Sequence, residues 1–166
     1  FAFYYPGDLD ALRRHGAELV SFDTLRDPHL PEVDALFIGG GFPETCAAEL
    51  EANSTLRAQI RQAIENGMPA YAECGGLMYL ARSLHWQGRS CRMVGAIPAD
   101  VTMHAKPVGR GYMRLAPTTD HPWPASSAGR GRSVRSTRST SVPETPSRSC
   151  AYRASAAVSG ASSPSR

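Results

Sequence analysis

The sequence of 166 residues lacks the patterns that define several common classes of protein. It has no long apolar stretch and no signal peptide, so we expect no membrane association and a reducing, cytoplasmic environment. It does not begin with methionine, and we expect it to be a piece of a longer protein. Its few cysteines show no C-x-x-C spacing and no Cys/His cluster, so we expect no metal site; they are Cys46, Cys74, Cys91 and Cys150.

Acidic residues are almost absent from the last part of the chain. Residues 125–166 contain seven arginines and one acid, a balance of +6, which leaves 11 basic and 14 acidic residues, or −3, in residues 1–124. The larger part is therefore mildly acidic, and we expect no nucleic-acid partner. Residues 125–166 also lack Leu, Ile, Phe, Met and Trp. Such a segment buries too little apolar surface to offset its ordering entropy, so we predict one domain at 1–124 and a disordered Ser/Arg-rich tail at 125–166.

Short apolar runs alternate with amphipathic segments along residues 1–124. This alternation predicts an α/β fold with a largely parallel sheet. Expected strands lie at 1–5, 18–22, 33–38, 68–72, 92–97, 101–104 and 112–115, and expected helices follow Asp8, Pro43, Asn53 or Ser54, and Cys74.

The stretch around Cys74 has the pattern of a sharp turn from a strand into a helix. An apolar run ends at Ala72, and two glycines, Gly75 and Gly76, follow the cysteine. Such a turn exposes its central side chain, and the following helix N-terminus favours a thiolate. Cys74 is therefore a candidate nucleophile, although a small buried core cysteine is an equally simple interpretation of the spacing alone.

A second glycine-rich turn, Gly39–Gly41, follows the expected strand 33–38. It lacks the Lys and Ser/Thr of a phosphate-binding loop, and by itself it suggests only a flexible connection. The carboxyl ends of parallel strands lie at one edge of a sheet, so we expect this turn beside Cys74. Backbone N–H groups of the turn and of Gly75 could then hold an oxyanion.

The motifs A-E-C-G-G-L-M-Y-L at 72–80, G-G-G-F-P-E at 39–44 and G-R-G-Y at 109–112 together resemble one family. It is the glutamine amidotransferase domain of cobyrinic acid (hydrogenobyrinic acid) a,c-diamide synthase, and the resemblance extends from Phe1 to about Pro124. It implies a flavodoxin-like three-layer sandwich, here incomplete at the C-terminus. It also implies a ligase of cobalamin biosynthesis that uses glutamine as amido donor, with the corrinoid, ATP and Mg²⁺ bound by an N-terminal domain absent here.

By this resemblance Cys74 is the nucleophile that attacks the glutamine carboxamide, and Gly40, Gly41 and Gly75 stand where oxyanion donors belong. The family's general-base histidine lies in a late His-Glu-x-His segment, which this sequence lacks. His104 and His121 remain, but neither has a matching context, so we expect impaired activity. Two alternatives stay open: a cobyric acid synthase-type amidotransferase domain, and a non-catalytic α/β binding module.

The missing segment leads to a hypothesis about residues 125–166. In one shifted reading register, the codons of residues 136–141 can encode His-Glu-Val-His-Phe, and those of 153–158 can encode Arg-Val-Arg-Arg-Gly. We hypothesise that the tail is translated out of frame, with the break between Pro124 and Arg132. The coding DNA tests this, because a register without His-Glu-x-His would eliminate it. A linker and a basic nucleic-acid arm are the alternatives for the tail.

Overall fold

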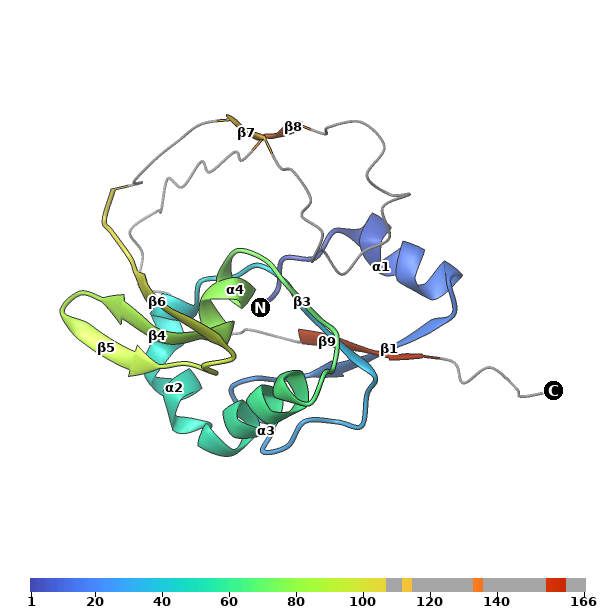
Figure 1. Ribbon diagram of the computed structural model, residues 1–166, viewed down its shortest axis with the longest axis horizontal. Coiled ribbons are helices and arrows are strands. Elements are labelled where there is room, and N and C mark those ends of the chain that lie inside the picture. Colours follow the sequence, from blue (N-terminus) through green and yellow to red (C-terminus); the bar gives the residue numbers. More distant parts are fainter. Residues whose placement is uncertain (107–111, 115–132, 136–154, 161–166) are drawn as a thin grey trace. The chain divides into compact units, whose positions relative to one another are not determined.

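The computed structural model describes residues 1–106, 112–114, 133–135 and 155–160 (Figure 1). The chain forms two compact units, one of residues 1–103 with 148–166 and one of residues 104–147. Within the second unit, β7 (Tyr112–Arg114) pairs antiparallel with β8 (Ser133–Arg135). The first unit contains every residue predicted to form the site.

A four-stranded sheet forms the centre of the first unit. Its order is β1 (Ala17–Phe22), β9 (Ser155–Gly160), β2 (Ala35–Ile38) and β3 (Ala70–Ala72). β2 and β3 are parallel, and β9 is antiparallel to both β1 and β2. The strands β1, β2 and β3 therefore point the same way, and the carboxyl ends of β2 and β3 meet at one edge.

A second, three-stranded sheet lies beside α4 (Gly75–Leu80), as Figure 1 shows. Its order is β5 (Arg89–Arg92), β4 (Ala81–Trp86) and β6 (Ile97–Thr102). β4 and β5 form an antiparallel hairpin through Gln87 and Gly88, both with positive φ, and β4 pairs parallel with β6. The site helix is thus held between two sheets, since it contacts both β3 and β4.

The remaining helices are α1 (Pro6–Arg14), the short 3-10 helix η1 (Pro43–Cys46), α2 (Ala47–Ala52) and α3 (Ser54–Glu65). α3 buries Leu56 and Ile60 completely, four residues apart on one helical face. These side chains belong to one core cluster with Leu36 and Ile38 of β2 and Tyr79 of α4. The core therefore fixes the position of the helix that follows Cys74.

The α/β fold is confirmed, with several local differences. Phe1–Tyr5 is not a strand; it makes one antiparallel bridge, Phe3 to Gly40. Asn53 occupies the N-cap position of α3, as predicted, but its side chain makes no capping bond and instead donates to the carbonyls of Thr24 and Asp27, at 3.0 and 2.9 Å. The helix after Cys74 ends at Leu80, so Leu84 lies in a strand.

Two described strands lie within residues 125–166, for which the sequence predicts disorder. β8 pairs with β7, and β9 completes the central sheet as an antiparallel strand. The sheet is therefore less parallel than predicted. The division into a domain at 1–124 and a disordered tail at 125–166 stays a prediction. The other residues of that tail lie outside the described residues, and the out-of-frame hypothesis stays a prediction.

Candidate active site

Cys74 occupies a tight turn between β3 and α4. Its φ of 48° and ψ of −113° lie in a region that L-residues rarely adopt. Hydrogen bonds fix the backbone before and after Cys74. The Glu73 N–H donates to the Ile38 carbonyl at 3.2 Å, and the Gly76 N–H donates to the Glu73 carbonyl at 2.8 Å. The turn presents the Cys74 thiol at the surface, whereas the other free cysteine of the described residues, Cys91, is buried.

The Gly39–Gly41 turn packs backbone to backbone against the start of α4. A methyl group placed on Gly75 would lie 2.8 Å from the Gly41 nitrogen, and one placed on Gly76 would lie 2.8 Å from the Gly39 carbonyl oxygen. A methyl group on Gly40 would lie 3.7 Å from Cβ of Cys74. The two glycine-rich turns therefore share one edge of the sheet with the thiol, as the topology predicts, and any side chain at residue 75 or 76 would separate them.

The three amides predicted as oxyanion donors differ in their hydrogen bonding. The Gly40 N–H donates to the Phe3 carbonyl at 3.2 Å, so this group is occupied. The N–H groups of Gly41 and Gly75 have no acceptor among the described residues. Sequence reasoning missed this difference because the Phe3 bridge joins residues far apart in the chain. Only Gly41 and Gly75 are available to bind an oxyanion in this structure.

The exposed large apolar side chains of the described residues gather on the segments that build this edge. Phe42 follows Gly41 and stacks edge-on against Phe3, with ring centroids 5.6 Å apart. Leu77 lies three residues after Cys74, one turn along α4, and is half exposed. The set is Phe3, Tyr5, Phe42, Tyr71 and Leu77. An apolar rim of this kind is typical of a surface that meets a ligand or a partner.

A tyrosine and a glutamate just before the nucleophile form a pair that the sequence analysis overlooked. Tyr71 and Glu73 project from the same side of the strand that leads to Cys74, and the Tyr71 hydroxyl donates to the Glu73 carboxylate at 3.4 Å. Partial burial and the Glu73 charge raise the pKa of Tyr71. The i, i+2 spacing in the sequence could have revealed this pair.

No described histidine contacts the thiol. His15 pairs with the Ala11 carbonyl, His29 with Gln59, and His85 with Ser83. His104 is exposed and belongs to the second unit, and His121 lies outside the described residues. The structure therefore supplies Cys74 with no general base in the part of the chain that it describes.

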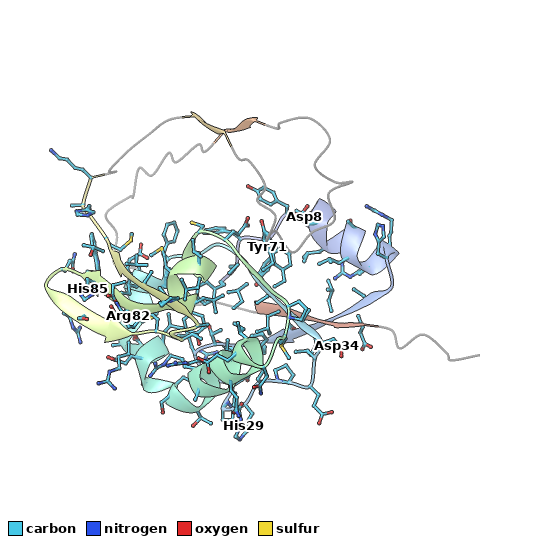
Figure 2. All side chains as sticks on the ribbon, viewed as in Figure 1. Asp8, His29, Asp34, Tyr71, Arg82 and His85 are labelled. Atoms are coloured by element: carbon cyan, nitrogen blue, oxygen red, sulfur yellow. The ribbon has the colours of Figure 1, made fainter. Side chains whose placement is uncertain are left out.

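A cavity and a charged cluster in the first unit lie apart from the predicted site residues. A cavity of about 370 Å³ lies between η1, α2 and the β4–β5 hairpin, and none of the predicted site residues lines it. On β4 and β6, Arg82 and Ser83 both bind Asp100, and Arg82 is labelled in Figure 2. Among the described residues, no group of three or more His, Cys, Asp or Glu side chains is arranged to hold a metal ion.

Comparison with known proteins identifies the family of this chain. Residues 1–130 match the CobB/CobQ-like glutamine amidotransferase domain. The chain belongs to this family. It is 51% identical over 124 residues to a cobyrinate a,c-diamide synthase of Magnetococcus marinus. The aligned residues are 75% of this chain and 27% of that relative. It is 48% identical over 112 residues to the enzyme of the same name from Archaeoglobus fulgidus. These residues are 68% of this chain and 24% of that relative.

A third relative of the same name, from Synechocystis, is 42% identical over 125 residues, which are 74% of this chain and 26% of that protein. This member of the amidotransferase family therefore spans about a quarter of the length of the curated relatives it matches. No solved structure matches it. None of the described helices is both long and apolar enough to cross a membrane.

Proposed function

We propose that this chain hydrolyses glutamine at Cys74 and supplies the ammonia with which a cobyrinate a,c-diamide synthase amidates two side chains of its corrinoid. The substrate would be cobyrinic or hydrogenobyrinic acid, and the amidation would take place in the cytoplasm. ATP and Mg²⁺ would act in the part of such enzymes that this chain does not span. The observation that carries the proposal is the exposed Cys74, held at a positive φ beside two unoccupied backbone amides.

The chemistry follows from these groups. The Cys74 thiolate attacks the carboxamide carbon of glutamine, and the carbonyl oxygen becomes an oxyanion that accepts hydrogen bonds from the Gly41 and Gly75 N–H groups. The carbon–nitrogen bond then breaks, and the nitrogen takes a proton and leaves as ammonia. Water attacks the remaining glutamyl thioester, which gives glutamate and restores the thiol.

Proton transfer is the weak step in this chain. The departing nitrogen needs a proton, and the described residues place no histidine at the thiol. General acid–base catalysis contributes about 10²–10⁴-fold to such reactions. We therefore expect thioester formation with slow turnover, and faster turnover in a chain whose coding register restores His-Glu-x-His.

The relatives bear on the alternatives. The three relatives named above are cobyrinate a,c-diamide synthases, which favours this enzyme over a cobyric acid synthase. A non-catalytic binding module would keep glutamine affinity without forming a covalent product at Cys74, so covalent capture separates the two classes.

The experiment is covalent capture by a glutamine-derived diazoketone, read by mass spectrometry of the intact chain and its peptides. We expect one adduct, on Cys74, and protection by excess glutamine. Cys74→Ala should abolish the adduct, whereas the matched control Cys91→Ala should retain it, because Cys91 is buried away from the glycine turns. Labelling that glutamine does not slow, or an adduct on another residue, would disprove the assignment.

A further inference from the structure

A second cavity of the first unit lies where the β4–β5 hairpin meets the end of β6. It has a volume of about 250 Å³, and none of the predicted site residues lines it. Every polar side chain that lines it can donate a hydrogen bond, and none of the described lining residues is acidic; the polar ones are His85, Gln87, Arg89, Ser90 and Thr102. A cavity surrounded by donors favours an anion.

Three of these donors form one row across the three-stranded sheet. Ser90 of β5 and Thr102 of β6 each lie directly opposite His85 of β4, which is labelled in Figure 2. Directly opposed residues project from the same face of a sheet as close neighbours. The pairing of the strands therefore places the imidazole between two hydroxyl groups at the cavity.

A chain of hydrogen bonds fixes the imidazole of His85. The Ser83 hydroxyl donates to the Asp100 carboxylate at 2.6 Å, and Ser83 Oγ lies 2.9 Å from His85 Nε2. A hydroxyl has one hydrogen, and Ser83 gives it to the carboxylate, so the hydrogen of the second bond belongs to Nε2. Nδ1 is then the ring nitrogen left for the cavity, and it becomes a donor when the ring is protonated.

Arg89 brings a guanidinium group to the same cavity. Arg13, Arg61 and Arg82 each pair with an acid, whereas Arg89 makes no ion pair with the described residues. A guanidinium fork fits two oxygens of a phosphate or a carboxylate. Trp86 and Met103, both partly buried, add an apolar part to the lining. The cavity thus combines a cationic set of donors with a surface for an organic group.

We propose that this cavity binds a phosphate monoester. Arg89, Ser90, Thr102 and protonated His85 hold the phosphate, and Trp86 contacts the organic group. Four donor side chains suit the three terminal oxygens of a phosphate better than the two oxygens of a carboxylate. The site goes beyond the proposed function, because it uses no group of the Cys74 turn.

The fluorescence of Trp86 reports binding directly. The sequence has one other tryptophan, Trp123, so every measurement uses the full chain with Trp123→Phe. The probes are inorganic phosphate, phenyl phosphate and benzoate, at constant ionic strength. We expect saturable changes, with a Kd of about 1 mM for inorganic phosphate and a value about 5- to 10-fold lower for phenyl phosphate. Benzoate should bind more weakly than phenyl phosphate, and Cys74→Ala should leave all three Kd values unchanged.

Substitutions of the lining residues separate a built site from diffuse charge. Arg89→Gln should raise the Kd for phenyl phosphate about 10-fold or more, and Ser90→Ala or Thr102→Val about 2- to 5-fold. The matched control is Arg92→Gln, an exposed arginine of the same strand that lies opposite Ser83 and does not line the cavity. It should leave the Kd nearly unchanged.

Sulfate tests the role assigned to His85, because its charge is constant between pH 8 and pH 5.5. The charged groups around the ring are Asp100 on β6, Arg89 and Arg92 on β5, and Arg82 on β4 itself. The arginines stay protonated and Asp100 stays ionised over this range, so the imidazole is the group that changes. The Kd for sulfate should fall about 5- to 10-fold from pH 8 to pH 5.5. His85→Gln should remove this dependence.

Four results would overturn the site. They are the absence of a saturable signal with phenyl phosphate, equal affinity for benzoate and phenyl phosphate, equal weakening by Arg89→Gln and Arg92→Gln, and an unchanged Kd in both Arg89→Gln and His85→Gln. Circular dichroism of each variant confirms folding, and the second variant of the last pair covers the case in which the first folds poorly. Covalent capture at Cys74 is independent of all four results, so failure of this site leaves the proposed function in place.

Discussion

The backbone of Gly41 lies against the α-carbon of Gly75, with no room for a side chain between them. A methyl group on Gly75 would lie 2.7 Å from the Gly41 carbonyl carbon and 2.8 Å from its nitrogen. Both neighbours are backbone atoms, so rotation of a side chain cannot relieve the overlap. This contact holds the Gly41 backbone against the start of α4, so glycine at residue 75 is required by space.

Gly75→Ala should therefore destabilise the fold and disrupt the site together. Overpacking of this kind typically lowers the free energy of unfolding by about 1–3 kcal/mol. Gly7→Ala is the matched control: it lies in α1 with nothing within 4 Å, and alanine there should raise the stability by about 0.5–1 kcal/mol. Urea unfolding of both variants measures the effect. Equal stability of Gly75→Ala and the unmodified chain would show that the turns can separate without loss.

Cys74→Gly should stabilise the chain while it abolishes covalent capture. Residues at sparsely populated backbone angles store about 1–3 kcal/mol, and glycine adopts a φ of 48° without this strain. Cys74→Ala keeps the strain and loses the thiol, so it separates the two effects. Thermal unfolding of the three chains should rank glycine above both cysteine and alanine. A lower melting temperature for Cys74→Gly would contradict the view that the turn is strained.

The buried Tyr79 makes the stability of the fold depend on pH in the alkaline range. Its side chain is completely buried, its hydroxyl has no partner among the described residues, and burial raises its pKa. A raised pKa in the folded state means that stability is full below the unfolded value, near 10, and is lost as the pH rises above it.

Tyr79→Phe should therefore unfold at nearly the same urea concentration as the unmodified chain at pH 7, because it removes a hydroxyl without a partner. Above pH 10 it should be the more stable of the two. Tyr79→Ala, which empties the same space, should lose about 3–5 kcal/mol at both pH values. Identical alkaline profiles for Tyr79→Phe and the unmodified chain would show that this hydroxyl does not titrate with unfolding.

Asp100 provides an acid-side test away from the site. Hydrogen bonds from Arg82 and then Ser83 hold its pKa well below its ordinary value. A lowered pKa in the folded state gives stability above the unfolded value, near 4, which is lost as the pH falls below it. Asp100→Asn should flatten the melting-temperature profile below pH 4. The pair is exposed, so the difference should be small and should shrink in high salt.

The sequence predicts the turn at Cys74 and its glycine neighbours better than it predicts the sheet, because the turn depends on short-range interactions. The turn at Cys74 depends on residues adjacent in the chain, and the meeting of the two glycine turns follows from parallel strand order. The occupied Gly40 amide depends on Phe3, and the short site helix depends on the pairing of β4 with β6. Leu84 fits a helical stripe as well as it fits a strand, so only the tertiary pairing decides between them.

Composition alone does not reveal a strand made of small residues. Residues 155–160 lie in a segment poor in large apolar side chains, yet they form a strand whose register runs from Ala17–Gly160 to Phe22–Ser155. Backbone hydrogen bonds do not require large side chains, so a segment of small residues can still complete a sheet. A rule based on apolar burial alone does not detect such a strand.

The position of β9 between β1 and β2 sets an order of events during synthesis. Among the described strands, β1 is hydrogen-bonded only to β9, and β9 is translated after all the others. Before β9 is translated, β2 and β3 can already pair, but the edge of β1 remains unpaired and open to other molecules. The edge of β1 is accordingly open to mispairing until residues 155–160 have been translated, and a chaperone that shields residues 17–22 would act in that interval.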